Sequence, residues 1–255
     1  MRRLFVGSES IQGDRIHITD KDDIFYLSTV LRMKVGDGLF VLSEQEKAFE
    51  ARIVETGRDG ILLDIAREVP IDKDFGTFVT LFQGLPKGAK MDEIVRKSTE
   101  LGVSRIVPVV TSRSVTGADG VSAAKEGRWR RIAEEAARQS RRVRVPEVAD
   151  VLLFDDAASG LAAGGFDLII VLFELEEECT LKRALRECRD RLAGPDGNAA
   201  PNVAVFIGPE GGFESKEIER LIGEGAESVT IGETILRTET AGPAAVAIIL
   251  YEYEL

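Results

Sequence analysis

The sequence predicts two domains, a small β-barrel over residues 1–72 and an α/β domain with a largely parallel sheet over residues 73–255. Three observations support this prediction. Short apolar or alternating runs, separated by turn residues, fill the first seventy positions. From residue 77 onward, apolar runs alternate with amphipathic helical patterns, which is typical of a parallel sheet. Between them, residues 69–76 combine a proline, a glycine and several charges with little apolar content, as segments between domains do.

The N-terminal part is expected to form five strands and one short helix. Residues 22–37 repeat apolar positions at near-helical spacing, begin with Asp22 and Asp23 as candidate N-caps and stop at Gly36. A short helix set into a barrel is therefore expected. The strands are expected at residues 3–6, 15–18, 38–43, 48–56 and 60–69.

The C-terminal part is expected to alternate five strands with five helices. Each strand is a short apolar run, and the first helix carries Met91, Ile94, Val95 and Leu101 on one face before Gly102 ends it. The strands are expected at residues 78–85, 104–110, 167–173, 202–208 and 228–232, and the helices at 90–103, 127–142, 180–194, 214–225 and 239–253.

Composition excludes several classes of protein. A chain of 255 residues with 44% hydrophobic residues can bury a substantial core, and its formal charge of −11 argues against general polybasic nucleic-acid binding. Two cysteines and one histidine cannot supply a zinc site of the usual spacing or a disulfide framework, and they argue against Ser-His-Asp and Cys-His catalysis. The longest stretch without charge, Thr240 to Tyr251, is too short to span a membrane, and the N-terminus lacks the features of a signal peptide. We therefore expect a cytoplasmic protein with no membrane segment and no metal.

Charge is unevenly distributed along the chain. Between Lys87 and Arg144 lie fourteen basic and seven acidic residues, so this segment is positive within an acidic protein. Arginine suits phosphate binding and base stacking, so the segment fits an RNA-facing surface. A solvated helix face, with its arginines paired to Glu134 and Glu135, explains the same residues.

A glycine-rich loop is the most informative local motif. An apolar strand leads into Gly208-Pro209-Glu210-Gly211-Gly212, and a helix with Glu214 or Ser215 as its cap follows. Ligands of open α/β sheets bind at this position, and glycines let backbone amides approach a ligand closely. The loop lacks the Lys and Ser/Thr of a P-loop, and the carboxylate of Glu210 would repel phosphate. The motif therefore favours a cationic or hydroxyl-rich ligand such as S-adenosylmethionine, although a tight turn between strand and helix also accounts for it.

A second segment, IGETILRTETA at residues 231–241, follows this loop after about twenty residues. Together they resemble the SPOUT class of methyltransferases, and specifically the RsmE family, which methylates N3 of a uridine in small-subunit ribosomal RNA. Residues 86–115, 128–148 and 30–37 are also similar to that family, so the resemblance spans nearly the whole chain. This sequence departs from the family pattern at Thr234, where many relatives have Arg, and at Phe25-Tyr26, where many have paired histidines.

The resemblance implies a PUA-like RNA-binding barrel at 1–72 and, at 73–255, a SPOUT domain whose C-terminal third forms a trefoil knot. It also implies a homodimer, S-adenosylmethionine as cofactor, and 16S rRNA, within the small ribosomal subunit, as substrate. The cofactor is expected to contact three loops. Their residues are Leu172, Phe173, Glu174, Gly208, Pro209, Glu210, Gly211, Gly212, Ile231, Gly232, Ile235, Leu236, Arg237 and Thr238.

The reaction needs a way to handle the N3 proton of uracil, a weakly acidic imide. Methyl transfer from a sulfonium is an in-line displacement that depends on positioning, so a base or a stabiliser of the uracil anion should lie close to the methyl group. Arg237 is the expected stabiliser, unless it is bound in a salt bridge to Glu239 or Glu210. Glu239 and Glu210 are both candidate bases, and the sequence does not choose between them.

RNA contacts are expected from basic residues of both domains. They are Arg2, Arg3, Arg32, Lys34, Lys87, Lys90, Arg113, Arg138, Arg141 and Arg142. Flipping of one uridine into the pocket would provide selection. Trp129 is expected in the core, and small residues in the last helix suggest a dimer contact.

Two other functions remain open at the level of sequence. The first is an inactive RNA-binding module that acts as a ribosome assembly factor. The second is an α/β enzyme that binds an adenine nucleotide on the glycine loop. The intact glycines and the complete ILRTETA stretch argue against the first, and tight binding of ATP without binding of S-adenosylmethionine would favour the second.

Overall fold

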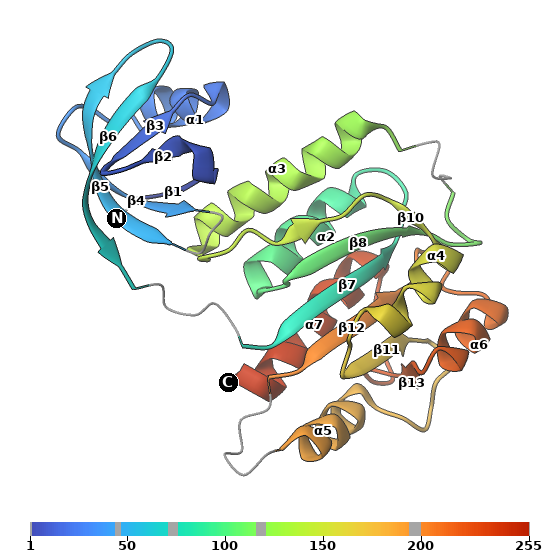
Figure 1. Ribbon diagram of the computed structural model, residues 1–255. Helices are drawn as coiled ribbons and strands as arrows, with labels where there is room; N and C mark the ends of the chain where they lie inside the picture. Colours follow the sequence, from blue (N-terminus) through green and yellow to red (C-terminus); the bar gives the residue numbers. More distant parts are fainter. Residues whose placement is uncertain (1, 44–46, 71–75, 116–120, 194–199, 255) are drawn as a thin grey trace. The chain divides into compact units, whose positions relative to one another are not determined.

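The computed structural model describes residues 2–43, 47–70, 76–115, 121–193 and 200–254, except for the side chains of Arg2 and Arg3 (Figure 1). The chain divides into two compact units, one formed by Met1–Asp74 with Arg138–Arg144 and the other by Phe75–Ala137 with Val145–Leu255. The domain boundary expected between residues 72 and 73 lies outside the described residues.

The N-terminal unit is a curled six-stranded sheet in the order β1-β4-β5-β6-β3-β2 (Figure 1). Apolar side chains alternate along its strands and meet inside the curl, with Leu4, Ile16, Leu39, Ile53 and Leu63 among the most buried. This alternation is the pattern from which the strands were predicted. The strands are β1 (Arg2–Val6), β2 (Ile11–Gln12), β3 (Arg15–Ile18), β4 (Gly38–Ser43), β5 (Ala48–Thr56) and β6 (Ile61–Val69).

The predicted helix of this unit is shorter than expected. Helix α1 covers only Lys21–Phe25, and a π-helical turn, Tyr26–Val30, follows it. The N-cap is Asp20, not Asp22 or Asp23, because the Asp20 carboxylate accepts the backbone amides of both later residues at 2.9 and 3.0 Å. The chain then turns through Arg32, whose φ of 53° lies in the left-handed region.

The C-terminal unit contains a seven-stranded sheet in which every pair is parallel, as predicted. Its order is β10-β8-β7-β12-β11-β13, with β9 beside β8. The central strands are continuous apolar runs because helices cover both faces. The strands are β7 (Phe78–Gly84), β8 (Arg105–Val110), β9 (Glu147–Val148), β10 (Leu152–Leu153), β11 (Leu168–Leu172), β12 (Asn202–Ile207) and β13 (Glu227–Val229).

Helices cover this sheet in two groups, each with its own core. Helices α2 (Lys90–Leu101), α3 (Ala123–Ser140), α5 (Leu181–Leu192) and α7 (Thr238–Glu254) contribute to one core. Helices α4 (Phe154–Ser159) and α6 (Ser215–Gly223) contribute to the other. The unit is thus a three-layered α/β domain (Figure 1).

Trp129 is fully buried in the core of this unit, as expected. Helix α4 and strands β9 and β10 were not predicted, because each is too short to show a period. Among the small residues of α7, Gly242 and Ala245 are buried, and a Cβ on Gly242 would lie 2.9 Å from Oε1 of Gln83 in β7. Ala244 and Ala247 are partly exposed, so a dimer contact through this helix stays a prediction. No helix within the described ranges is long and apolar enough to cross a membrane.

Candidate active site

Three neighbouring strands deliver the predicted cofactor loops to one edge of the sheet. β12, β11 and β13 are parallel and adjacent, so their carboxyl ends lie side by side. Leu172 ends β11 and Phe173–Glu174 follow it, Gly208–Gly212 follows β12, and Ile231–Arg237 lies between β13 and α7. Open α/β sheets bind ligands at the carboxyl ends of their strands.

These loops surround a cavity of about 930 Å³. Thirteen of the fourteen predicted cofactor residues line it, and only Gly211 does not. The walls also include residues that the sequence did not suggest for this role: Lys90, Glu176, Glu177, Thr180, Ile207, Val229, Thr230, Glu233, Thr234, Glu239 and Ala241. The cavity lies toward the upper end of the sizes that small-molecule sites have.

Close packing explains the glycines of the loop at least as well as ligand contact. A Cβ on Gly208 would lie 2.9 Å from the carbonyl carbon of Gly212, so the loop closes on itself. Gly212 has a φ of +67°, and a Cβ there would lie 2.6 Å from Oε1 of Glu174. At the end of β7, a Cβ on Gly84 would lie 2.6 Å from the ring of Pro209. Only glycine fits these positions without displacement of neighbouring atoms.

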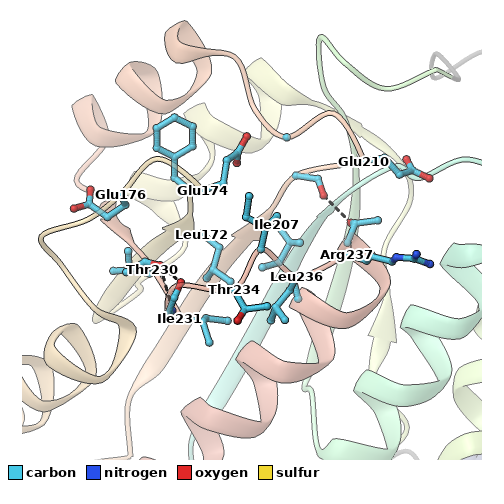
Figure 2. A pocket seen from close by; sticks show the side chains of 18 of the residues that line it. Leu172, Glu174, Glu176, Ile207, Glu210, Thr230, Ile231, Thr234, Leu236 and Arg237 are labelled. Carbon is cyan, nitrogen blue, oxygen red and sulfur yellow. Dashed lines mark hydrogen bonds between the residues drawn. The ribbon is translucent and has the colours of Figure 1, made fainter.

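A buried chain of hydrogen bonds connects the loop to two other elements. Thr238, the first residue of α7, donates its hydroxyl to the carbonyl of Gly208 at 2.7 Å (Figure 2). The same hydroxyl accepts from Nε2 of Gln83 at 2.9 Å, and Nε2 also donates to the carbonyl of Gly84 at 3.0 Å. Strand β7, the glycine loop and the start of α7 are therefore fixed relative to one another.

A second support comes from the segment after β8. Arg113 donates from Nη1 to the carbonyl of Gly211 at 2.6 Å. The adjacent amide of Ser112 donates to the buried carboxylate of Glu217 at 2.9 Å, and that carboxylate also accepts the amide of Glu214, the N-cap of α6. The glycine loop is thus held from both sides.

A lysine and two carboxylates form an ionic cluster at one end of the cavity. The ammonium of Lys90 lies 2.8 Å from Oε1 of Glu210 and 3.6 Å from Oε2 of Glu239. The amide of Lys87 also donates to Glu210. Burial acts to raise the pKa of Glu210, but the Lys90 ammonium and backbone amides outweigh burial and lower that pKa. Glu210 is therefore ionised near neutral pH.

The opposite wall is acidic (Figure 2). Glu174 and Glu176 lie there, after β11. Glu176 accepts the backbone amides of Cys179 and Glu178 at 3.0 and 2.9 Å, and these bonds lower its pKa. Among the described residues, six glutamates and two basic residues line the cavity, which suits a cationic ligand better than a polyanion.

The residues expected to bind RNA are in varied environments. Lys34, Lys87, Arg113 and Arg141 are exposed, as is Arg32. Arg138 is paired with Asp23 at 2.6 Å with only 13% of its side chain exposed, and its guanidinium lies over the ring of Tyr26. Arg142 is buried. Arg138 and Arg142 therefore offer little surface for a phosphate, and the side chains of Arg2 and Arg3 lie outside the described part.

Several residues of the site were not identified from sequence. Gln83 is the clearest case, and it had a signal: it is a polar residue within the otherwise apolar end of a buried strand, beside a glycine. Glu176 and Glu217 had none, because each lies in an acidic segment typical of solvated surface. Within the part of the chain that the structure describes, no group of three or more His, Cys, Asp or Glu residues could hold a metal ion.

Comparison with known proteins agrees with this geometry. An RNA methyltransferase domain family matches residues 74–250, and an RNA methyltransferase PUA domain family matches residues 18–66. The chain is 31% identical to the ribosomal RNA small subunit methyltransferase E of Bacillus subtilis, covering 96% of this chain and 91% of that protein. It is also 31% identical to the protein of the same name from Synechocystis, covering 96% of this chain and 76% of that protein.

Solved structures are also similar over the whole length. The ribosomal RNA small subunit methyltransferase E of Neisseria gonorrhoeae, whose crystal structure is bound to S-adenosyl methionine, matches with a TM-score of 0.82 at 26% identity, covering 99% of this chain and 98% of that one. Sequence and fold thus agree across both units, and the chain belongs to the ribosomal RNA small subunit methyltransferase E family, with a PUA domain followed by a SPOUT-type methyltransferase domain.

Proposed function

We propose that this protein transfers the methyl group of S-adenosylmethionine to N3 of a specific uridine in 16S rRNA of the small ribosomal subunit. The main support is the cavity at the ends of β11, β12 and β13, where nearly all the residues expected to hold the cofactor come together from three separate loops. The names of the relatives and the cofactor in the Neisseria structure point to the same reaction.

The residues of the cavity fit S-adenosylmethionine. Its sulfonium and ammonium are cationic, and the wall that contains Glu174 and Glu176 is acidic. The packed glycines of residues 208–212 present backbone rather than side chains to the cavity. When bound, the cofactor supplies an electrophilic methyl group, so no metal or covalent nucleophile is needed. The excess of carboxylates also disfavours the alternative of an adenine nucleotide with its phosphates, and the intact cavity disfavours an inactive RNA-binding module.

Arg237 is the proposed stabiliser of the uracil anion. Arg237 lines the cavity from the loop between β13 and α7, with its guanidinium at the same end of the pocket as Glu210 (Figure 2). No described residue forms a hydrogen bond or an ion pair with the side chain of Arg237. A permanent positive charge close to the uracil oxygens would lower the energy of the anion that forms when N3 loses its proton. Glu210 and Glu239 are already bound to Lys90, which weakens the case for either as the base.

The RNA is proposed to contact exposed basic residues of both units. Lys34, Lys87, Arg113 and Arg141 remain suitable, with Arg32 as a further contact, because their side chains reach solvent. We also propose that the protein is cytoplasmic and acts as a homodimer. Ile235 in the pocket loop is 79% exposed, and such an exposed apolar side chain is consistent with a partner subunit. Measurement of mass in solution tests the dimer. The trefoil knot is proposed on the family resemblance.

Transfer of labelled methyl to small subunits that lack the modification tests the function. Wild type, Arg237→Ala and a control, Arg220→Ala, would be compared, and the labelled base mapped. Arg220 is a suitable control because its contacts in the described part of the chain, with Glu224 and with Ser159 of α4, lie outside the cavity. Wild type is expected to label N3 of a uridine. Arg237→Ala should lower kcat about 10²- to 10³-fold, and Arg220→Ala should leave kcat unchanged. Absence of label with wild type, while subunits are still bound, would instead support the inactive module.

A further inference from the structure

Lys90 connects two acidic residues that come from different parts of the chain. It is the first residue of α2, whereas Glu210 lies in the loop after β12 and Glu239 in the first turn of α7. Its ammonium contacts both carboxylates, at 2.8 and 3.6 Å. The side chains are 37% exposed for Lys90, 29% for Glu210 and 13% for Glu239. Removal of the lysine would leave two partly buried negative charges without their partner.

Arg237 is the other basic residue among those described around this cavity. Unlike Lys90, its side chain contacts no carboxylate there. Figure 2 shows its side chain and that of Glu210 at the same end of the pocket, and Glu239 is only two residues further along the chain. Either carboxylate would be an obvious partner for a guanidinium. In the described part of the chain, however, both carboxylates contact Lys90, and Arg237 has no side-chain partner.

We infer that Lys90 is a positioning residue that holds Glu210 and Glu239 away from Arg237, so that the guanidinium stays available to the uracil. The inference rests on the proposed function and adds a residue to it. It also gives Lys90 a role other than the phosphate contact expected from sequence, because the ammonium is directed at carboxylates of its own chain.

The protonation states are consistent with this arrangement. The hydrogen bond to Glu210 raises the pKa of Lys90 above its ordinary value, although burial acts in the other direction. Glu210 has a lowered pKa, as described above. The lysine and this carboxylate are thus both charged throughout the neutral range, and the cluster does not release Glu210 by titration near pH 7.

Neutralisation of the charges in the cluster provides the test. Methyl transfer would be measured at saturating S-adenosylmethionine for wild type, Lys90→Met, Lys90→Arg and the triple variant Lys90→Met/Glu210→Gln/Glu239→Gln. Lys90→Met is expected to lower kcat about 10- to 30-fold, less than outright removal of an electrostatic stabiliser, because Arg237 is still present but is engaged by the freed carboxylates. Lys90→Arg should retain most activity. The triple variant should exceed Lys90→Met, because neutral amides no longer attract Arg237.

Two outcomes would overturn the inference. If Lys90 contacts RNA directly, the triple variant would be no more active than Lys90→Met, and the loss would appear in KM. If either carboxylate is the base, the triple variant would be less active than Lys90→Met. An inactive wild type would refute the proposed function instead, so the two failures are distinguishable.

Discussion

Replacement of Thr238 by valine tests the hydrogen-bond chain that fixes the glycine loop. Valine has nearly the same shape but removes the hydroxyl, which donates to the carbonyl of Gly208 and accepts from Gln83. Gln83 keeps its bond to Gly84, so the main cost is a carbonyl without its donor and a weakened buried amide. An unsatisfied buried polar group costs about 1–3 kcal/mol, and we expect Thr238→Val to lower the free energy of unfolding by about 2 kcal/mol.

Thr238→Ser is the matched control, because it keeps the hydroxyl and loses one methyl group, worth about 0.8 kcal/mol. The single tryptophan, Trp129, is fully buried in the C-terminal unit, so its fluorescence during denaturant unfolding reports the unit that contains the substitution. Affinity for S-adenosylmethionine would be measured in parallel and should fall more for valine than for serine. Equal stability of the two variants, within about 0.5 kcal/mol, would show that the hydroxyl contributes nothing and refute the reasoning.

Three further outcomes are expected. Gly212→Ala should weaken cofactor binding and cost about 1–2 kcal/mol of stability, because the φ of +67° disfavours any side chain. Gly211→Ala is the control, because Gly211 has no positive φ and a Cβ there would lie 3.2 Å from Cβ of Arg113. Equal effects of the two substitutions in calorimetry would contradict the explanation. Arg138→Met should destabilise the N-terminal unit by about 3 kcal/mol, measured by circular dichroism, because it removes a largely buried ion pair with Asp23; an unaffected unfolding transition would argue against this. Glu254 accepts the backbone amide of Thr77, just before β7. Burial acts to raise the pKa of Glu254, but the hydrogen bonds from Thr77 and Gly76 together lower it. The contribution of Glu254 to stability is therefore present above the pKa of the unfolded state, about 4.3, and is lost as pH falls through the lower folded value. Glu254→Gln should remove that part of the acid dependence, and identical pH profiles would contradict the assignment.

The order and type of the main elements follow from local patterns. The apolar runs that became β7, β8, β11 and β12 and the amphipathic patterns that became α2 and α5 are readable because each is long enough to show a period. The short pieces, such as α4, are not. Helix α1 shows a different limit: its spacing is nearly helical, but the choice of Asp20 as cap and the π-helical turn depend on how the segment packs in its sheet.

The loops expected to hold the cofactor come together in the structure, where thirteen of the fourteen predicted residues line one cavity. They could be located from sequence because glycine-rich and strand-terminal residues are local signals, and their contact with the cofactor stays a prediction. The contacts of the basic residues were predicted less accurately than the loops. A sequence shows that Lys90, Arg113 and Arg138 are cationic, but not what each faces. In the structure they contact Glu210, the carbonyl of Gly211 and Asp23, at separations in sequence of about one hundred residues.

The sequence by itself determined the fold class, the family and which loops meet around the cavity at the strand ends, since these depend on periodicity, turn chemistry and motif order. Only the tertiary structure decided which charges neutralise one another. Ion pairs act over a few ångströms, and residues such as Lys90 and Glu210 reach that distance only when the sheet brings the ends of separate segments together. The availability of Arg237 is therefore a property of the folded chain and not of its local sequence.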